Sequence, residues 1–249
     1  MRRETQNILL VLLGGALLKL AMTGTFLRYV KPSHKWLLIA AGAVVVLLAL
    51  VSIGRDLIAA QRAEPRRDQP GGMVEGHAGH RHASSTAWLL LLPVLAVFLV
   101  APPALGADSV QRAATTNRSA AAVGGTEVFP PLPKDAVLAL PMSEFSARAA
   151  WDSGHSLDDR QIRLTGFVVH DRDVIYLARL AIACCAADAF PVKVRLADGP
   201  ELGGLGDDTW VEAVVTVQPG SATKTNDYVP SATVVDLTQV AQPEDPYEH

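Results

Sequence analysis

The sequence predicts a membrane-anchored α + β protein, in which three transmembrane helices precede a small OB-like antiparallel β-barrel domain. Charge-poor apolar stretches concentrate in residues 1–107, an Ala-, Ser-, Thr- and Gly-rich segment follows at 108–127, and residues 128–249 contain alternating strand-like runs. The composition agrees, because 49% of the residues are hydrophobic and only 6% are aromatic, which is typical of membrane proteins. We therefore expect a membrane domain, a flexible linker and a soluble β domain in this order.

Three apolar stretches are predicted to span the bilayer, at residues 8–30, 36–54 and 87–106. Each is close to the roughly 20 residues that cross a hydrocarbon core as a helix. Lys19 lies near the middle of the first, where an ionisable group is costly in lipid, and we expect it to face the interior that the helices share with a partner. Gly14 and Gly15 would permit close contact with another helix, and Pro93 predicts a kink in the third span.

Basic residues near the predicted spans indicate the orientation. The loop at 55–86 contains five arginines and the amino terminus begins Met-Arg-Arg, so both are expected to be cytoplasmic. The third span then places the carboxyl-terminal domain outside the plasma membrane. The basic residues of the first connection, Arg28, Lys31 and Lys35, favour the opposite orientation. A small-residue sequence ending at Gly106 resembles a signal peptidase site, and cleavage there would release the β domain.

The predicted cytoplasmic loop also contains three histidines, His77, His80 and His82, separated by glycine, alanine and arginine. Histidine-rich tracts can bind transition metals, so a weak metal site is one interpretation. A solvated loop without a ligand is the other. Beyond such a transition metal, we expect no cofactor.

Six strand-like runs and one helix are predicted in the β domain. Ser143 is the expected N-cap of a helix that continues to Trp151, and Gly166 interrupts the first long strand, which predicts a bend or bulge. Short antiparallel strands with such a bend suit a small closed barrel. The tail at 243–249 is expected to be frayed. The strands are expected at 136–140, 161–169, 174–182, 190–196, 209–218 and 232–240.

The two cysteines of the chain, Cys184 and Cys185, are adjacent at the end of an apolar run. Neighbouring residues of an extended strand point to opposite faces, so a bend is needed to bring both thiols to one side. Their Cα atoms lie about 3.8 Å apart, which is too close for an unstrained disulfide. Together with Arg179 and Asp188 they form the predicted binding site. A buried structural role, an easily reduced redox pair and a soft-metal site are the alternatives.

Two other classes of function are not expected. The net charge is −3, and no basic run is interleaved with aromatic residues, so we expect no nucleic-acid partner. The sequence also has neither a GxSxG nucleophile elbow nor a phosphate-binding loop. We therefore expect no catalytic residues and no enzymatic activity.

Several sequence strings resemble a known family. They are Thr165-Gly-Phe-Val168, Leu177-Ala-Arg-Leu180 and Cys184-Cys-Ala-Ala-Asp-Ala189, which follow a segment with Leu92-Pro93 and Ala101-Pro-Pro103. The combination resembles the YcgQ-like permease-subunit family of bacterial membrane proteins, most specifically through the cysteine string. The resemblance implies a partner, a separate and larger polytopic permease, but no reaction.

The expected function is therefore that of an accessory, non-catalytic subunit of a membrane permease. Its extracytoplasmic β domain would bind or gate a substrate near Cys184 and Cys185. The alternative is an extracytoplasmic thiol redox sensor or enzyme, or a soft-metal-binding protein. The expected partners are the permease and the lipid bilayer.

Overall fold

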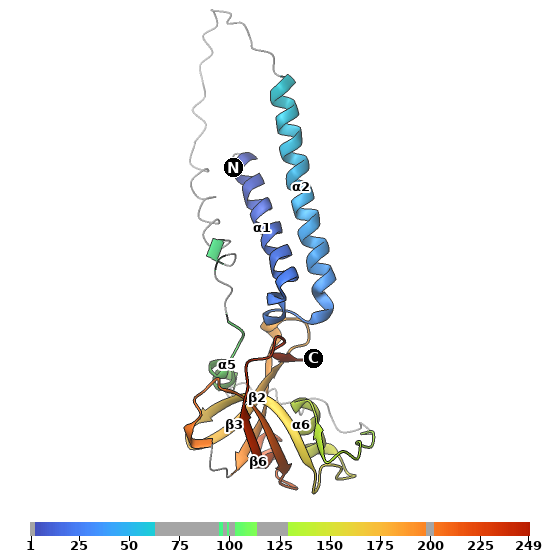
Figure 1. The fold of residues 1–249 in the computed structure, drawn as a ribbon, viewed down its shortest axis with the longest axis vertical. Helices are drawn as coiled ribbons and strands as arrows, with labels where there is room; N and C mark the ends of the chain where they lie inside the picture. The colour runs from blue at the N-terminus through green and yellow to red at the C-terminus, as the bar shows by residue number, and fades with distance from the viewer. Residues whose placement is uncertain (1–2, 63–94, 97–98, 100–102, 114–128, 198–201) are drawn as a thin grey trace, which may run out of the picture. The chain divides into compact units, whose positions relative to one another are not determined.

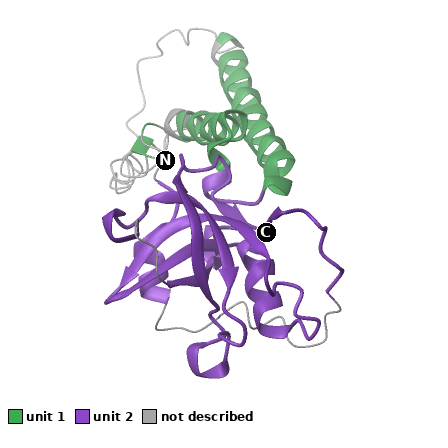
Figure 2. Ribbon diagram, turned by 60° about the horizontal axis from the view of Figure 1, so that its bottom comes forward, with its two compact units in different colours: residues 1–26, 32–102 green, residues 27–31, 103–249 purple. Residues whose placement is uncertain are grey.

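The computed structural model describes residues 3–62, 95–96, 99, 103–113, 129–197 and 202–249 (Figure 1). The chain divides into two compact units, one of residues 1–26 and 32–102 and the other of residues 27–31 and 103–249 (Figure 2). Residues 27–31, which lie between the first two helices in the sequence, thus belong to the same unit as the β domain. Most of the predicted third span lies outside the described residues, as do residues 63–86 of the predicted loop with its three histidines. Residues 55–62, which we expected to begin that loop, are helical instead.

The first unit contains two apolar helices, α1 (Arg3–Thr23) and α2 (Lys35–Arg62). Both are long and apolar enough to anchor in a membrane, and their candidate spans, Gln6–Thr23 and Pro32–Ala59, overlap the first two predicted ones. Short 3-10 helices at Thr25–Arg28 and Pro32–His34 lie between them in the sequence.

The two helices pack closely where glycines replace larger side chains. A Cβ atom at Gly14 would meet the Val46 side chain at 2.7 Å, and one at Gly42 would meet the Leu18 side chain at 2.9 Å. The predicted role of Gly14 is therefore confirmed, whereas a Cβ at Gly15 would meet no heavy atom within 4 Å. Lys19 is exposed on α1, and its expected place facing a partner stays a prediction.

The second unit is built on a mixed sheet of seven strands in the order β1-β2-β5-β6-β4-β3-β7. Strands β2, β3 and β6 are labelled in Figure 1. The six predicted strands are confirmed to within two residues at each end, and β7 was not predicted. The bounds are β1 (Val137–Ala139), β2 (Gln161–Asp171), β3 (Val174–Ala181), β4 (Phe190–Ala197), β5 (Trp210–Val217), β6 (Ser231–Gln239) and β7 (Tyr247–Glu248).

The prediction of an entirely antiparallel barrel is wrong, because β1–β2, β4–β6 and β3–β7 pair in parallel. Strand β4 runs in the direction of β2, because β3 is antiparallel to both. Strand β6 also runs in the direction of β2, because β5 is antiparallel to both, so β4 and β6 pair in parallel. The structure establishes a mixed β sheet rather than a closed antiparallel barrel.

Strand β2 changes its neighbour along its length. Residues 162–167 pair with β5 and residues 167–171 pair with β3, both antiparallel. The change follows Gly166, the position at which the sequence predicts a bend. A Cβ atom there would meet the carbonyl oxygen of Ala178 at 2.6 Å and the Met142 side chain at 2.8 Å. Glycine is therefore needed at this point, because the backbone of β3 and helix α6 approach too closely for a side chain.

Two clusters of buried side chains stabilise this unit. The first includes Phe145 of helix α6 (Met142–Trp151) together with Ile162 and Leu164 of β2. The second includes Trp210 and Tyr247 together with Val110 of helix α5 (Ala107–Ala113). Residues 107–113, where we expected the end of the membrane domain and the start of the linker, thus form a helix packed on the β domain. Residues 114–127 lie outside the described part of the chain.

Helix α6 is capped by a residue from the end of the chain. The carboxylate of Glu248 accepts hydrogen bonds from the backbone N–H groups of Met142 (2.6 Å) and Ser143 (2.8 Å). The predicted N-cap, Ser143, lies inside the helix instead. The expected fraying of the tail is also wrong, because β7 pairs with β3 and both Tyr247 and Glu248 are buried.

Candidate functional site

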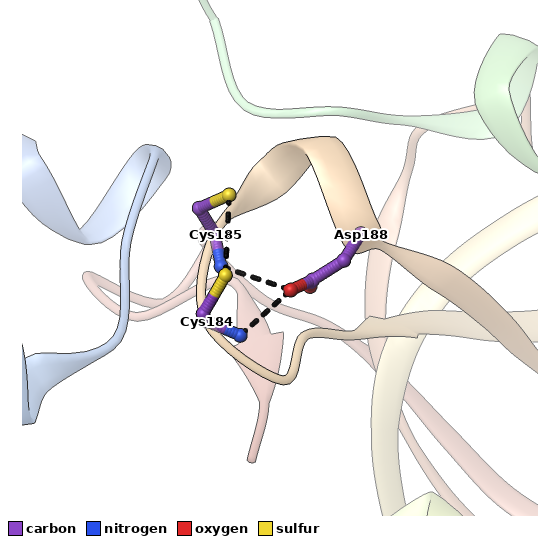
Figure 3. A group of neighbouring side chains, drawn as sticks. All are labelled: Cys184, Cys185 and Asp188. Carbon is purple, nitrogen blue, oxygen red and sulfur yellow. Dashed lines mark hydrogen bonds between the residues drawn. The ribbon is translucent and has the colours of Figure 1, made fainter.

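The two cysteines lie in the connection between β3 and β4, which we call the cysteine loop (residues 182–189). Strand β3 ends at Ala181, and the backbone N–H of Ile182 still donates to the carbonyl of Glu248 at 2.9 Å. The chain then turns through both cysteines into a 3-10 helix, Ala186–Asp188. The bend that the adjacent cysteines require is present, and the two Sγ atoms lie 3.5 Å apart (Figure 3).

Asp188 organises the cysteine loop. Its carboxylate accepts hydrogen bonds from the backbone N–H groups of Ala183 (2.9 Å), Cys184 (2.8 Å) and Cys185 (3.4 Å). A hydrogen bond with the Cys184 thiol, together with these backbone bonds, outweighs desolvation and lowers the pKa of Asp188. The carboxylate is therefore ionised at neutral pH and fixes the path of the backbone around both sulfurs.

The same carboxylate controls the ionisation of the nearer thiol. The hydrogen bond from Cys184 to Asp188, followed by the contact with Cys185, raises the pKa of the Cys184 thiol to about 12. Cys184 is consequently a neutral thiol at neutral pH, and a free thiolate at this position is disfavoured. Cys184 is exposed and Cys185 is half-buried, so a purely structural role as buried cysteines is wrong.

Three potential metal ligands meet at this loop. One sulfur from each cysteine and a carboxylate oxygen of Asp188 all lie within 4.8 Å of one another. Among the residues that the structure describes, this is the group of three such donors whose positions suit one ion. Its chemistry combines two soft sulfur donors with one hard oxygen donor.

A segment from the beginning of the chain borders the cysteine loop. The backbone N–H of Ala186 donates to the carbonyl of Tyr29 at 2.7 Å, and that of Lys31 donates to the carbonyl of Cys184 at 3.3 Å. Val30 and Cys185 form an isolated antiparallel bridge. All of these residues belong to the unit that contains the sheet, and these main-chain contacts hold the cysteine loop against residues 29–31.

Tyr247 links the same segment to the tail and to Leu105, which precedes α5. Its hydroxyl donates to the carbonyl of Arg28 (3.0 Å) and accepts from the backbone N–H of Leu105 (3.1 Å). Burial raises the pKa of Tyr247, so the hydroxyl keeps its proton at physiological pH. Residues 29–31 and Tyr247 were not predicted as part of the site. Neither a short connection nor a proline-containing tail carries a sequence signal for such contacts.

The other predicted site residues lie elsewhere. The guanidinium of Arg179 donates to the carbonyls of Asp245 (3.0 Å) and Tyr247 (3.5 Å) and lies over the ring of Trp210, 5.7 Å from its centroid. Arg179 therefore holds the carboxyl-terminal segment. Lys19 belongs to the first unit, and His77, His80 and His82 lie outside the described residues.

These features define a class of protein with two apolar amino-terminal helices and a mixed β domain that exposes a two-thiol, one-carboxylate loop. Residues 5–115 match the DUF1980 N-terminal domain, and residues 153–249 match the DUF1980 C-terminal domain. The chain thus contains both DUF1980 domains, in this order. Neither description assigns an activity or names a permease subunit.

Comparisons with curated proteins and with solved structures identify no further relative from which a function could be inferred. No curated protein matches the chain. The crystal structure of a provisionally assigned aspartyl-tRNA synthetase from Leishmania major Friedlin is similar over 56% of this chain, with 12% sequence identity and a TM-score of 0.27. The chain spans only 26% of that structure, and a likeness of this degree supports no conclusion about fold or function.

Proposed function

We propose that the protein is a membrane-anchored, non-catalytic accessory subunit of a permease, and that its β domain binds the substrate at the cysteine loop. The observation that supports this most directly is the convergence of Cys184, Cys185 and Asp188 on an accessible turn. The exposed Cys184 thiol, the half-buried Cys185 thiol and the ionised Asp188 carboxylate are donor groups available to a ligand from solution. The polytopic partner is the part of the proposal that rests on the family resemblance.

The surface of the helix pair supports the membrane anchor. Large apolar side chains are exposed along α2, among them Trp36 (76%), Leu37 (66%) and Leu47 (61%). Exposed apolar surface of this extent is unfavourable in water and favourable in lipid or against other transmembrane helices. We therefore place α1 and α2 in the bilayer, with a partner against them.

The position of residues 27–31 supports the orientation of the β domain. These residues connect α1 to α2 and pair with the cysteine loop. If both helices span the bilayer, the β domain lies on the side that this connection reaches, opposite the amino terminus. With the amino terminus in the cytoplasm, the cysteine loop is extracytoplasmic, at the plasma membrane.

A thiol redox function is the second candidate, and the 3.5 Å separation of the sulfurs favours it. The raised pKa of Cys184 opposes it, because thiol–disulfide exchange proceeds through the thiolate. A carboxylate that accepts a hydrogen bond from the thiol keeps the sulfur protonated and unreactive until another group displaces that proton. We therefore place ligand binding ahead of redox chemistry.

Co-purification tests the accessory role. We expect the full-length protein, solubilised from its own cell's membranes in mild detergent with a crosslinker, to retain a larger polytopic membrane protein. Lys19→Leu should reduce the yield of that protein, because the charge is expected to face the shared interior. Lys134→Leu, a matched change at an exposed position of the β domain, should not. Failure to retain any polytopic protein from these membranes would contradict the proposal.

A further inference from the structure

We infer that Cys184, Cys185 and Asp188 bind a thiophilic divalent metal ion, with Zn²⁺ as its representative, and that this ion is the substrate that the β domain receives. The inference rests on the function proposed above, because it names the substrate class of the same site. It adds a ligand set and a chemistry that the family match does not provide.

The distances fit such an ion. Zinc bonds to thiolate sulfur at about 2.3 Å, so two sulfurs on a tetrahedral ion lie about 3.8 Å apart. The two Sγ atoms are already 3.5 Å apart, and the carboxylate oxygen lies within 4.8 Å of both. The three donor atoms are therefore already close to the separations that a single ion requires.

The donor set indicates both the kind of metal and the use of the site. Two thiolates favour soft or borderline ions over Mg²⁺ and Ca²⁺, which prefer oxygen ligands. Structural zinc sites are closed by four protein ligands, whereas three ligands leave a position for water or for a group of another protein. An exposed three-ligand site can therefore receive an ion and release it, as a transport subunit must.

The surrounding hydrogen bonds prepare the site for a cation. Three backbone N–H groups orient the Asp188 carboxylate, as second-shell donors commonly do for metal ligands. On binding, M²⁺ takes the place of the thiol protons of Cys184 and Cys185, and both protons leave to solvent. The complex then carries a charge of −1 from one M²⁺, two thiolates and one carboxylate, and no electron is transferred.

Cobalt binding to the full-length protein in detergent tests the site directly. After reduction and removal of metals, we expect one Co²⁺ per chain, with the near-ultraviolet sulfur-to-cobalt charge-transfer absorption, and displacement by Zn²⁺. Cys184→Ser and Cys185→Ser should each reduce this absorption and together abolish it. Asp188→Asn should weaken Co²⁺ binding by about 10- to 100-fold, as expected for a ligand or for a residue that orients ligands.

Matched controls separate this site from others. Asp173→Asn, the same change at an exposed position of the β2–β3 turn, should leave Co²⁺ binding unchanged. The triple variant His77→Ala, His80→Ala, His82→Ala should also keep the charge-transfer absorption. Zn²⁺ should in addition protect both cysteines of the wild-type protein from alkylation, which gives a readout independent of cobalt.

Three results would overturn the inference. They are the lack of a thiolate absorption in the wild-type protein, its persistence when both cysteines are replaced, and its loss in the histidine variant alone. The binding measurement needs no permease, so the two proposals fail separately. Retention of a polytopic partner without metal binding would remove the metal inference only, and metal binding without a partner would remove the accessory role only.

Discussion

Replacement of Glu248 tests whether the end of the chain stabilises the β domain. Glu248 is 8% exposed, and its carboxylate accepts hydrogen bonds of 2.6 Å and 2.8 Å from the first turn of α6. Hydrogen bonds to charged groups contribute about 1.5–3 kcal/mol each, and loss of a helix cap costs about 0.5–2 kcal/mol. Because the half-buried Ser143 N–H can recover a bond to water, we expect Glu248→Ala to lower the free energy of unfolding by about 3 kcal/mol.

A short series of variants isolates the cap from the loss of charge. Glu248→Gln keeps one acceptor oxygen and should cost about half as much as Glu248→Ala. Glu244→Ala removes the same charge from an exposed position of the same tail, and its effect should lie within about 0.5 kcal/mol of zero. Denaturant unfolding of the full-length protein in detergent, followed by tryptophan fluorescence, measures these differences.

Hydrogen exchange of α6 provides the decisive local measurement. If Glu248 acts as the cap, the amides of Met142 and Ser143 should exchange faster in Glu248→Ala while those in the middle of β5 change less. Equal stability of Glu248→Ala and Glu244→Ala would refute the capping argument. A loss of stability with unchanged exchange at the start of α6 would refute its assigned cause.

Two further predictions concern β2 and the cysteine loop. Gly166→Ala should destabilise the domain by about 2–3 kcal/mol in denaturant unfolding, because overpacking against a backbone carbonyl is hard to relieve. Gly203→Ala is its control, since a Cβ there meets no heavy atom within 4 Å, and a similar loss in both variants would contradict the explanation. Alkylation of Cys184 should be slow at pH 8 and accelerate only as the pH approaches its pKa of about 12. Asp188→Asn removes the negative charge that favours the protonated thiol, so the pKa of Cys184 should fall. Alkylation of Cys184 at pH 8 should then accelerate at least about tenfold. An unchanged alkylation rate would refute the assigned cause.

The strands could be predicted because their side chains alternate. Ile162, Leu164 and Val168 lie on one face of β2 and are buried, as the period of two requires. Gly166 in the same strand also indicated the position of the bend. The parallel pairings could not be predicted, because they depend on which strands become neighbours after the chain has passed through β5. The local alternation of apolar and polar residues contains no information about these neighbours.

The site could be predicted only in part. The adjacency of Cys184 and Cys185 identified the loop, and Asp188 was included because it is close in the sequence. The hydrogen bonds from three successive backbone N–H groups to its carboxylate could not be predicted, because they depend on a 3-10 helix of only three residues. Strand β7 was missed because only two residues form it, next to Pro246, and because its stability comes from pairing with β3 and from the burial of Tyr247 rather than from its own propensity.

The restraint of the cysteine loop explains how two vicinal thiols can stay on one side without a bond between them. Asp188 holds the loop from within, the carbonyl of Tyr29 accepts from Ala186, and the carbonyl of Glu248 accepts from Ile182. A loop fixed in this way loses little conformational entropy when it binds a ligand. The ordering of the loop therefore lowers the affinity for the ligand only slightly. Because the Tyr29 and Glu248 contacts use main-chain carbonyls, a side-chain substitution at Val30 or Lys31 should disturb the loop less than a one-residue deletion in residues 29–31, which would shift the register of the Val30–Cys185 bridge.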